Sequence, residues 1–240
     1  MPVVMFDLYG TLIEEDDYDY NRALRWMADT YFNDRFEELQ KLSCLFKANY
    51  MHIRAVSSLE SSFRAQLVFF EKALNYKLQD SYQIVEAGFI RRFRKEKLKD
   101  GAISLLRMLH DCKIRIYVLT NSLFSGENLK AHLASVGIED VVEAVYSSAD
   151  IGYRKPSQEV FQYVLADIGV HDSSQVVYIG DSYEKDYLGA QTIGLHSILV
   201  TSSPDYANIA LPNLFSLESY LKACVECHVV AAPLMRHVVL

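Results

Sequence analysis

The stretch Val3-Val4-Met5-Phe6-Asp7-Leu8-Tyr9-Gly10-Thr11-Leu12 places a carboxylate directly after a short apolar run. Such a run predicts a buried strand, and Asp7 stands where that strand would open into a loop. Two later apolar runs end in the same way: residues 114–119 meet Thr120-Asn121-Ser122, and residues 176–179 meet Gly180-Asp181-Ser182. Parallel strands place their carboxyl ends on one edge of a sheet, where ligands bind. We therefore predict that three polar clusters converge there.

The composition narrows the class of protein. The chain has 240 residues, half of them hydrophobic, with a formal net charge of -7 and an isoelectric point near 5.5. A chain of this length can bury a sizeable core. The acidic balance argues against a broad surface for DNA or RNA. We expect a small-molecule ligand and no nucleic-acid partner.

Targeting signals are not evident in the sequence. No stretch approaches the roughly 18 uninterrupted apolar residues of a membrane span, and the amino terminus lacks a basic region followed by an apolar core. Four cysteines are too few for a disulfide framework in a chain this long. We expect a cytoplasmic protein that does not bind a membrane, and the sequence leaves open whether it is a monomer or a homodimer.

One local motif near the carboxyl end fits more than one kind of structure or binding site. Cys224-Val225-Glu226-Cys227-His228 fits the spacing for covalent haem attachment, and two such cysteines could also ligate zinc. Haem attachment requires export, and a zinc site requires further ligands that no second Cys-x-x-Cys supplies. We favour an amphipathic last helix. The apolar residues 229–240 could pack on the core or form an interface.

The distribution of proline and apolar residues along the sequence predicts two domains. Between residues 18 and 98 there is no proline, and apolar residues recur at helical spacing, as in Leu39, Leu42, Leu45 and Phe46. This block predicts an all-α cap. Residues 1–17 and 99–240 form the predicted core, whose strands alternate with helices and therefore imply parallel crossovers. We predict an α/β fold: a doubly wound, Rossmann-like parallel sheet with the cap inserted after its first strand.

The boundaries of the core elements follow from the same patterns. Beyond residues 3–6, the predicted strands cover residues 114–119, 141–146, 176–180 and 196–200. The predicted helices cover residues 100–110, 125–136, 156–168 and 184–193 and a last segment from Leu217, with Pro156 in the first turn of its helix.

Taken together, the polar motifs resemble those of the haloacid dehalogenase superfamily of hydrolases. Four motifs occur in the family's order: Asp7-x-Tyr9-Gly10-Thr11, Thr120-Asn121-Ser122, Lys155-Pro156, and Gly180-Asp181-Ser182 followed by Asp186. The resemblance spans essentially the whole chain, and four motifs in order with strand contexts are specific. It implies a Mg²⁺-dependent phosphatase with a small phosphorylated substrate.

The resemblance also assigns roles to residues. It implies that Mg²⁺ is held by Asp7, Asp181 and the backbone carbonyl of Tyr9. The chemistry of these groups agrees, because a carboxylate nucleophile such as Asp7 can form an acyl phosphate but cannot approach a phosphate dianion without a hard cation beside it.

The remaining motif residues have supporting roles. Thr120, Asn121 and the amides that follow would donate to phosphoryl oxygens, since a helix beginning near Ser125 leaves unpaired N–H groups. Lys155 would stabilise the charge of the transferring group, and Asp186 would steady Lys155 or a bound water. Gly10 would permit a sharp turn, and Ser182 would open the helix after Asp181.

Tyr9 departs from the phosphatase pattern. Phosphatases of the superfamily carry an Asp at this place, which protonates the leaving oxygen, whereas a phenol is a weaker acid and a poor base near neutral pH. The 2-haloacid dehalogenases share Asp-x-Tyr-Gly-Thr, so a dehalogenase is the first alternative. The acidic fourth motif favours metal and phosphate instead. A catalytically impaired phosphate-binding or regulatory protein is the second alternative.

Substrate selectivity is expected to come from the cap, which would close over the site and exclude water. Tyr18, Tyr20, Arg22 and Trp26 lie early in the insertion and could line its mouth, although aromatic residues at such spacing more often belong to the core.

Overall fold

The computed structural model describes residues 2–14 and 18–226. Cys227, His228 and the apolar residues 229–240 lie outside the described residues, so the interpretations of that segment stay predictions. Cys224 is half-buried near the end of the last helix, α10 (Leu214–Glu226).

A parallel sheet forms the centre of the core, in the order β3-β2-β1-β4-β5-β6. The strands are β1 (Val3–Phe6), β2 (Arg115–Thr120), β3 (Ala144–Ser147), β4 (Val176–Gly180), β5 (His196–Val200) and β6 (Ala210–Leu211). The first strand lies between β2 and β4, with Phe6 opposite both Val118 and Ile179. The ends of these three strands are therefore neighbours, and the predicted α/β fold class is confirmed.

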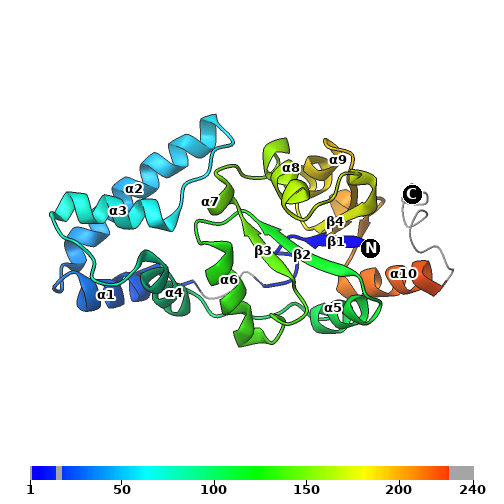
Figure 1. Ribbon diagram of the computed structural model, residues 1–240, viewed down its shortest axis with the longest axis horizontal. Coiled ribbons are helices and arrows are strands. Elements are labelled where there is room, and N and C mark those ends of the chain that lie inside the picture. The colour runs from blue at the N-terminus through cyan, green and yellow to red at the C-terminus, as the bar shows by residue number, and fades with distance from the viewer. Residues whose placement is uncertain (1, 15–17, 227–240) are drawn as a thin grey trace.

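Helices cover both faces of the sheet (Figure 1). Val4 and Phe6 point to the face covered by α5 (Ala102–Asp111), α6 (Gly126–Leu133) and α10, while Val3 and Met5 point to the face covered by α8 (Gln158–Asp167) and α9 (Gly189–Gln191). Because successive strand side chains alternate in direction, a strand covered on both faces must be apolar throughout. This explains the uninterrupted Val-Val-Met-Phe run, all of it buried.

Four helices lie between β1 and α5 and form the left-hand lobe in Figure 1. They are α1 (Tyr20–Tyr31), α2 (Phe36–Val56), α3 (Phe63–Leu74) and α4 (Tyr82–Phe93). Phe32, Phe63, Phe70 and Phe89 are buried between them. A buried Phe contributes roughly 1.5–3 kcal/mol relative to an exposed one, so this cluster stabilises the lobe. We keep the name cap for residues 18–98; that boundary stays a prediction.

Two sets of contacts fasten the cap to the core. At α4, Glu86 accepts hydrogen bonds from the Ser125 N–H (2.6 Å), the Ser125 hydroxyl (2.9 Å) and the Asn128 side chain (2.9 Å). At the carboxyl end of α2, the Arg154 guanidinium donates to the carbonyls of Arg54 and Ser57. The cap is therefore tied to the core at two separate places.

Several element boundaries differ from the predictions. The strand predicted at 141–146 is β3 at Ala144–Ser147, and β6 was not predicted. The helix predicted at 184–193 is a π-helical segment, η3 (Tyr183–Leu188), followed by the short α9.

Pro156 does not occupy the first turn of α8. The Lys155–Pro156 peptide bond is cis, and the Ser157 N–H donates to the Arg154 carbonyl (3.1 Å). This turn encloses Pro156, so Ser157 takes the N-cap position and the helix begins at Gln158.

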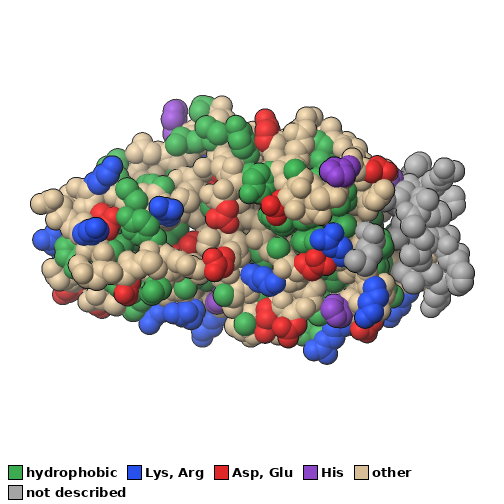
Figure 2. All heavy atoms as spheres, in the orientation of Figure 1, with side chains coloured by type: hydrophobic (Ala, Val, Ile, Leu, Met, Phe, Trp, Pro, Cys, Tyr) green, Lys and Arg blue, Asp and Glu red, His purple; other side chains and the backbone are tan. Residues whose placement is uncertain are grey.

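The shorter helical segments are α7 (Ser148–Ile151) and the 3₁₀ turns Ala134–Val136, Ser173–Gln175 and Pro204–Tyr206. Within the described ranges, no helix combines the length and the apolar character needed to cross a bilayer. On the face seen in Figure 2, acidic and basic side chains are interspersed, so neither charge dominates that face.

Candidate active site

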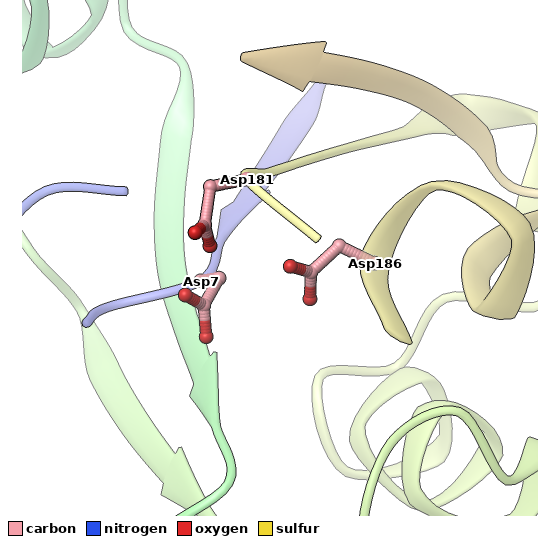
Figure 3. Close-up of side chains that lie close together, drawn as sticks. All are labelled: Asp7, Asp181 and Asp186. Carbon is pink, nitrogen blue, oxygen red and sulfur yellow. The ribbon is translucent and has the colours of Figure 1, made fainter. Parts of the chain in front are cut away.

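Three carboxylates converge at the carboxyl edge of the sheet (Figure 3). Asp7 follows β1, Asp181 follows β4, and Asp186 belongs to η3. One oxygen from each lies within 4.8 Å of the others. The Asp7 N–H donates to the Ile179 carbonyl (2.8 Å), which extends the β1–β4 pairing and holds Asp7 beside Asp181. The parallel register thus brings together residues that are far apart in the sequence.

Lys155 supplies the positive charge at the centre of this cluster. Its Nζ donates to Asp7 Oδ1 (2.7 Å), Asp186 Oδ1 (2.6 Å) and the Tyr178 hydroxyl oxygen (2.7 Å), and its side chain is only 2% exposed. Burial acts to lower the pKa of Lys155, but the charges of Asp186 and Asp7 raise it above its usual value. Lys155 is therefore a buried ammonium group with all three protons donated.

Asn121 holds the backbone of Lys155. Its side-chain amide donates to the Lys155 carbonyl (2.9 Å), and its side-chain oxygen accepts from the Lys155 N–H (2.8 Å). Both ends of its side chain thus join the end of β2 to the loop before α8, and the phosphate-binding role of Asn121 stays a prediction. Its position makes Asn121 a positioning residue for Lys155.

Two glycines allow the carboxylates to approach so closely. Gly10 has φ +90°, a left-handed conformation, and a Cβ there would lie 2.5 Å from Asp181 Oδ2. At Gly180, a Cβ would lie 2.4 Å from the Asp186 side chain. Both positions exclude a larger residue on steric grounds.

Thr11 contacts both Asp7 and Asp181. Its hydroxyl oxygen lies 3.3 Å from Asp7 Oδ2 and 3.3 Å from Asp181 Oδ1. A single hydroxyl proton can satisfy only one of them at a time.

The oxygens of Asp186 are, in contrast, all paired. Oδ1 accepts from Lys155, and Oδ2 accepts from the Ser182 N–H (3.0 Å). The Ser182 hydroxyl accepts from the Lys185 N–H, which caps η3 and fixes the helix that carries Asp186. Asp7 and Asp181 are therefore the members of the cluster with most capacity for a further ligand.

The cluster is short of positive charge. Burial, helped by the charges of Asp186 and Asp181, raises the pKa of Asp7 to about 7 against the attraction of Lys155. Burial and Asp186 likewise raise the pKa of Asp181, although Lys99 opposes them. Carboxylate oxygens are the ligands that Mg²⁺ prefers, and like-charged carboxylates at this spacing favour a bound cation. The residues present therefore fit the predicted magnesium ion.

The expected free amides at the start of α6 are not available. The Ser122 N–H donates to the Ser148 hydroxyl (2.9 Å), the Ser125 N–H to Glu86, and the Gly126 N–H to Asp150 (2.7 Å). Cap and core side chains thus already accept from these three N–H groups, and the prediction that amides after Thr120 donate to phosphoryl oxygens stays a prediction. Thr120, buried at the end of β2, keeps its predicted place at the sheet edge.

Tyr9 is held by residues at the end of the cap. Its hydroxyl donates to Glu96 Oε1 (3.0 Å), and the Arg94 guanidinium lies 4.3 Å from its ring centroid. Burial raises the pKa of Tyr9 above its usual value, Arg94 opposes the rise, and Glu96 adds to it. The phenol is therefore neutral and its proton is directed to Glu96.

A cavity of about 1030 Å³ lies between the cap and the end of β2. Its wall contains Asn121 and Ser122 from the core, and Tyr18 and Tyr20 as predicted; Arg22 and Trp26 are not among its lining residues. Trp26 packs on Gly88 and Arg92 instead. Eight aromatic side chains line it: Tyr9, Tyr18, Tyr20, Phe46, Tyr50, Phe63, Phe93 and Phe124.

Three residues that contact the site were not predicted from the sequence: Tyr178, Lys99 and Glu96. Tyr178 lies inside the apolar run of β4, yet its hydroxyl accepts from Lys155 and donates to the Leu119 carbonyl (3.1 Å). Lys99 donates to the Gly10 carbonyl, and Glu96 accepts from Tyr9. The sequence signal for Tyr178 was a hydroxyl group in a buried strand, because a buried polar atom needs a hydrogen-bond partner. No sequence signal marked Lys99 or Glu96, because their partners lie almost 90 positions away in the chain.

Known proteins show similarity in sequence and in structure. A pyrimidine 5'-nucleotidase, YjjG of Escherichia coli (strain K12), is 32% identical over 95 residues, 40% of this chain and 41% of that protein. The chain therefore matches less than half of that relative's length. Ribulose-1,5-bisphosphate 5-phosphatase of Halopiger xanaduensis is 24% identical over 216 residues, 84% of this chain and 85% of that protein.

Among solved structures, a 2-haloacid dehalogenase from Pseudomonas syringae pv. Tomato DC3000 superposes with a TM-score of 0.60 at 21% identity, covering 93% of this chain and 99% of that one. This likeness concerns the fold alone. The family model of haloacid dehalogenase-like hydrolases matches residues 1–194, which contain all four motifs. The chain belongs to the haloacid dehalogenase-like hydrolase family.

Proposed function

We propose that this hydrolase is a Mg²⁺-dependent phosphatase that acts on a small phosphorylated metabolite through an aspartyl-phosphate intermediate on Asp7. The observation that carries the proposal is the cluster of Asp7, half-buried Asp181 and Asp186, in which Lys155 pairs with Asp7 and Asp186. A dehalogenase has no use for these additional carboxylates, since they would weaken the nucleophile without a cation. The similar nucleotidase and bisphosphate phosphatase also support phosphate chemistry.

Asp7 is the nucleophile in this mechanism. One of its oxygens forms a bond to phosphorus while the bond from phosphorus to the leaving oxygen breaks; water then attacks the acyl phosphate and restores the carboxylate. Asp7, Asp181 and the Tyr9 carbonyl would hold Mg²⁺, which when bound neutralises carboxylate and phosphate charge. Lys155 and Thr120 stabilise the charge on the transferring oxygens, and Asn121 and Asp186 hold Lys155 in place.

Tyr9 sets the preference for leaving groups. A neutral phenol that donates to Glu96 is a weak proton donor for a departing alkoxide. Substrates whose leaving group needs little protonation, such as acyl and aryl phosphates, should therefore react faster. The aromatic wall of the cavity suits an aryl group, because flat rings pack well against one another.

Hydrolysis of nitrophenyl phosphate and of glycerol phosphate, each with Mg²⁺ and with a chelator, tests the proposal. We expect Mg²⁺-dependent turnover and an aryl-to-alkyl rate ratio of about 10² or more, the size of a missing acid/base contribution. Turnover that persists in the chelator contradicts the metal assignment. Equal rates with the chemical step limiting contradict the role given to Tyr9.

A 2-haloacid dehalogenase is the second candidate. Halide departs without a proton, so a tyrosine at position 9 in place of a stronger acid would not slow that reaction. In that case Asp7 would attack carbon and form an ester. Chloride release from 2-chloropropionate in the presence of a chelator is the assay that distinguishes it. We expect none.

A further inference from the structure

A second pocket lies where α4 meets α6. It has a volume of about 430 Å³ and is lined by the end of α4, by Arg94, Lys95 and Glu96, and by α6 side chains that include His132. Arg94 is the one lining residue that it shares with the larger cavity. None of the carboxylates at the sheet edge lines it, so this junction pocket is separate from the proposed catalytic centre.

The walls of the junction pocket are positively charged. Arg91, Arg94 and Lys95 contribute three cations and Glu96 one carboxylate, which leaves a net charge of +2 with His132 neutral. Glu96 is the one carboxylate among these lining residues: its Oε1 accepts from Tyr9 and lies 4.0 Å from the Arg94 guanidinium and 3.5 Å from His132 Nε2. Burial, Arg94 and Arg91 lower the pKa of His132 below its usual value.

One buried donor in this pocket, Arg94 Nε, makes no hydrogen bond within the described residues. His132 Nε2 makes none either, but it lies 3.5 Å from Glu96 Oε1. Arg94 is 7% exposed, and the His132 side chain is 11% exposed. An unpaired buried donor costs about 1–3 kcal/mol, which an acceptor placed beside Arg94 Nε would recover.

We propose that the junction pocket binds a small oxyanion, a phosphate group either free or as a monoester. Arg94 offers the planar fork of donors that matches phosphate oxygens, and Arg91 and Lys95 add charge at the rim. The volume leaves room for a short carbon skeleton beside the phosphate. Because Arg94 also lies over the Tyr9 ring, the bound anion would contact a side chain that also lines the larger cavity.

The His132 ring is a local reporter, since it lines this pocket and not the larger cavity. Inorganic phosphate and glycerol phosphate would each be titrated into ¹⁵N-labelled protein in a chelator while the His132 ring resonances are followed by NMR. We expect a saturable shift. Tighter binding of one ligand tells whether the site takes the free ion or the monoester.

The double variant Arg91→Gln/Lys95→Gln should weaken this binding by about tenfold or more, the factor for losing one charge-assisted contact. A matched variant, Arg25→Gln/Lys77→Gln, alters two exposed cap cations outside both pockets and should bind as the wild type does. Unmoved His132 resonances, or equal affinity in the two double variants, would overturn the proposal. The measurement needs no turnover, so its result is independent of the phosphatase assay.

Discussion

The edge of the sheet and the cavity beneath the cap are built in opposite ways. At the edge, four segments distant in sequence each contribute one or two polar groups, and almost every oxygen has a partner within 3.3 Å. The cavity draws most of its wall from one continuous insertion, and eight of its twenty lining residues are aromatic. Under the proposed function, reaction chemistry and substrate choice would belong to different parts of the chain and could be altered separately.

The largest expected effect comes from the edge. Asp7→Asn removes the nucleophile and should lower kcat by at least about 10⁴-fold for every phosphate ester. Steady-state assays with nitrophenyl phosphate and Mg²⁺ would measure it, with Asp172→Asn, an exposed change in a distant turn, as the control. Residual turnover near the wild-type rate would place the reaction elsewhere.

A second change tests whether the edge also supports the fold. Lys155→Met leaves Asp7 and Asp186 buried without their cation and should lower the free energy of unfolding by about 3–5 kcal/mol. Urea denaturation in a chelator would measure it. Lys97→Met makes the same replacement at an exposed ion pair with Glu14, where we expect a loss of about 1 kcal/mol or less. Similar losses in the two variants would show that burial of the cluster is not the deciding factor.

The smallest effect is expected at the cavity. Phe46→Ala removes part of the aromatic wall and should raise KM for nitrophenyl phosphate by about tenfold, since a lost apolar contact of this kind is worth about 1–3 kcal/mol. KM for acetyl phosphate should not change, because its acyl group is too small to reach that wall. Phe215→Ala, on the exposed face of α10, is the matched control. Equal changes for both substrates would contradict a separate selectivity region.

The strands that meet at the edge could be predicted because each is an apolar run ended by a polar residue. That pattern located β1, β2, β4 and β5 closely. It failed for β6, whose two residues are too few to show any periodicity. The pattern also predicted the start of β3 too early, because Val141 and Val142 are typical strand residues although they lie before the strand.

Contacts within the site were harder to predict than its residue types. The four motifs identified Asp7, Lys155, Asp181 and Asp186 as site residues. Nothing in the sequence predicted that the Asn121 side chain would form hydrogen bonds with the Lys155 backbone. Capping of α6 by Glu86 of the cap was also hidden, since that pairing joins residues about 40 positions apart. Such pairings depend on how the elements pack, and a local pattern does not contain that information.

The two ties between cap and core have a kinetic consequence. Glu86 anchors α4, and Arg154 anchors the carboxyl end of α2. We expect that a hinge motion of the cap about one of these ties would strain the other, so wide opening of the cap would require both sets of hydrogen bonds to break.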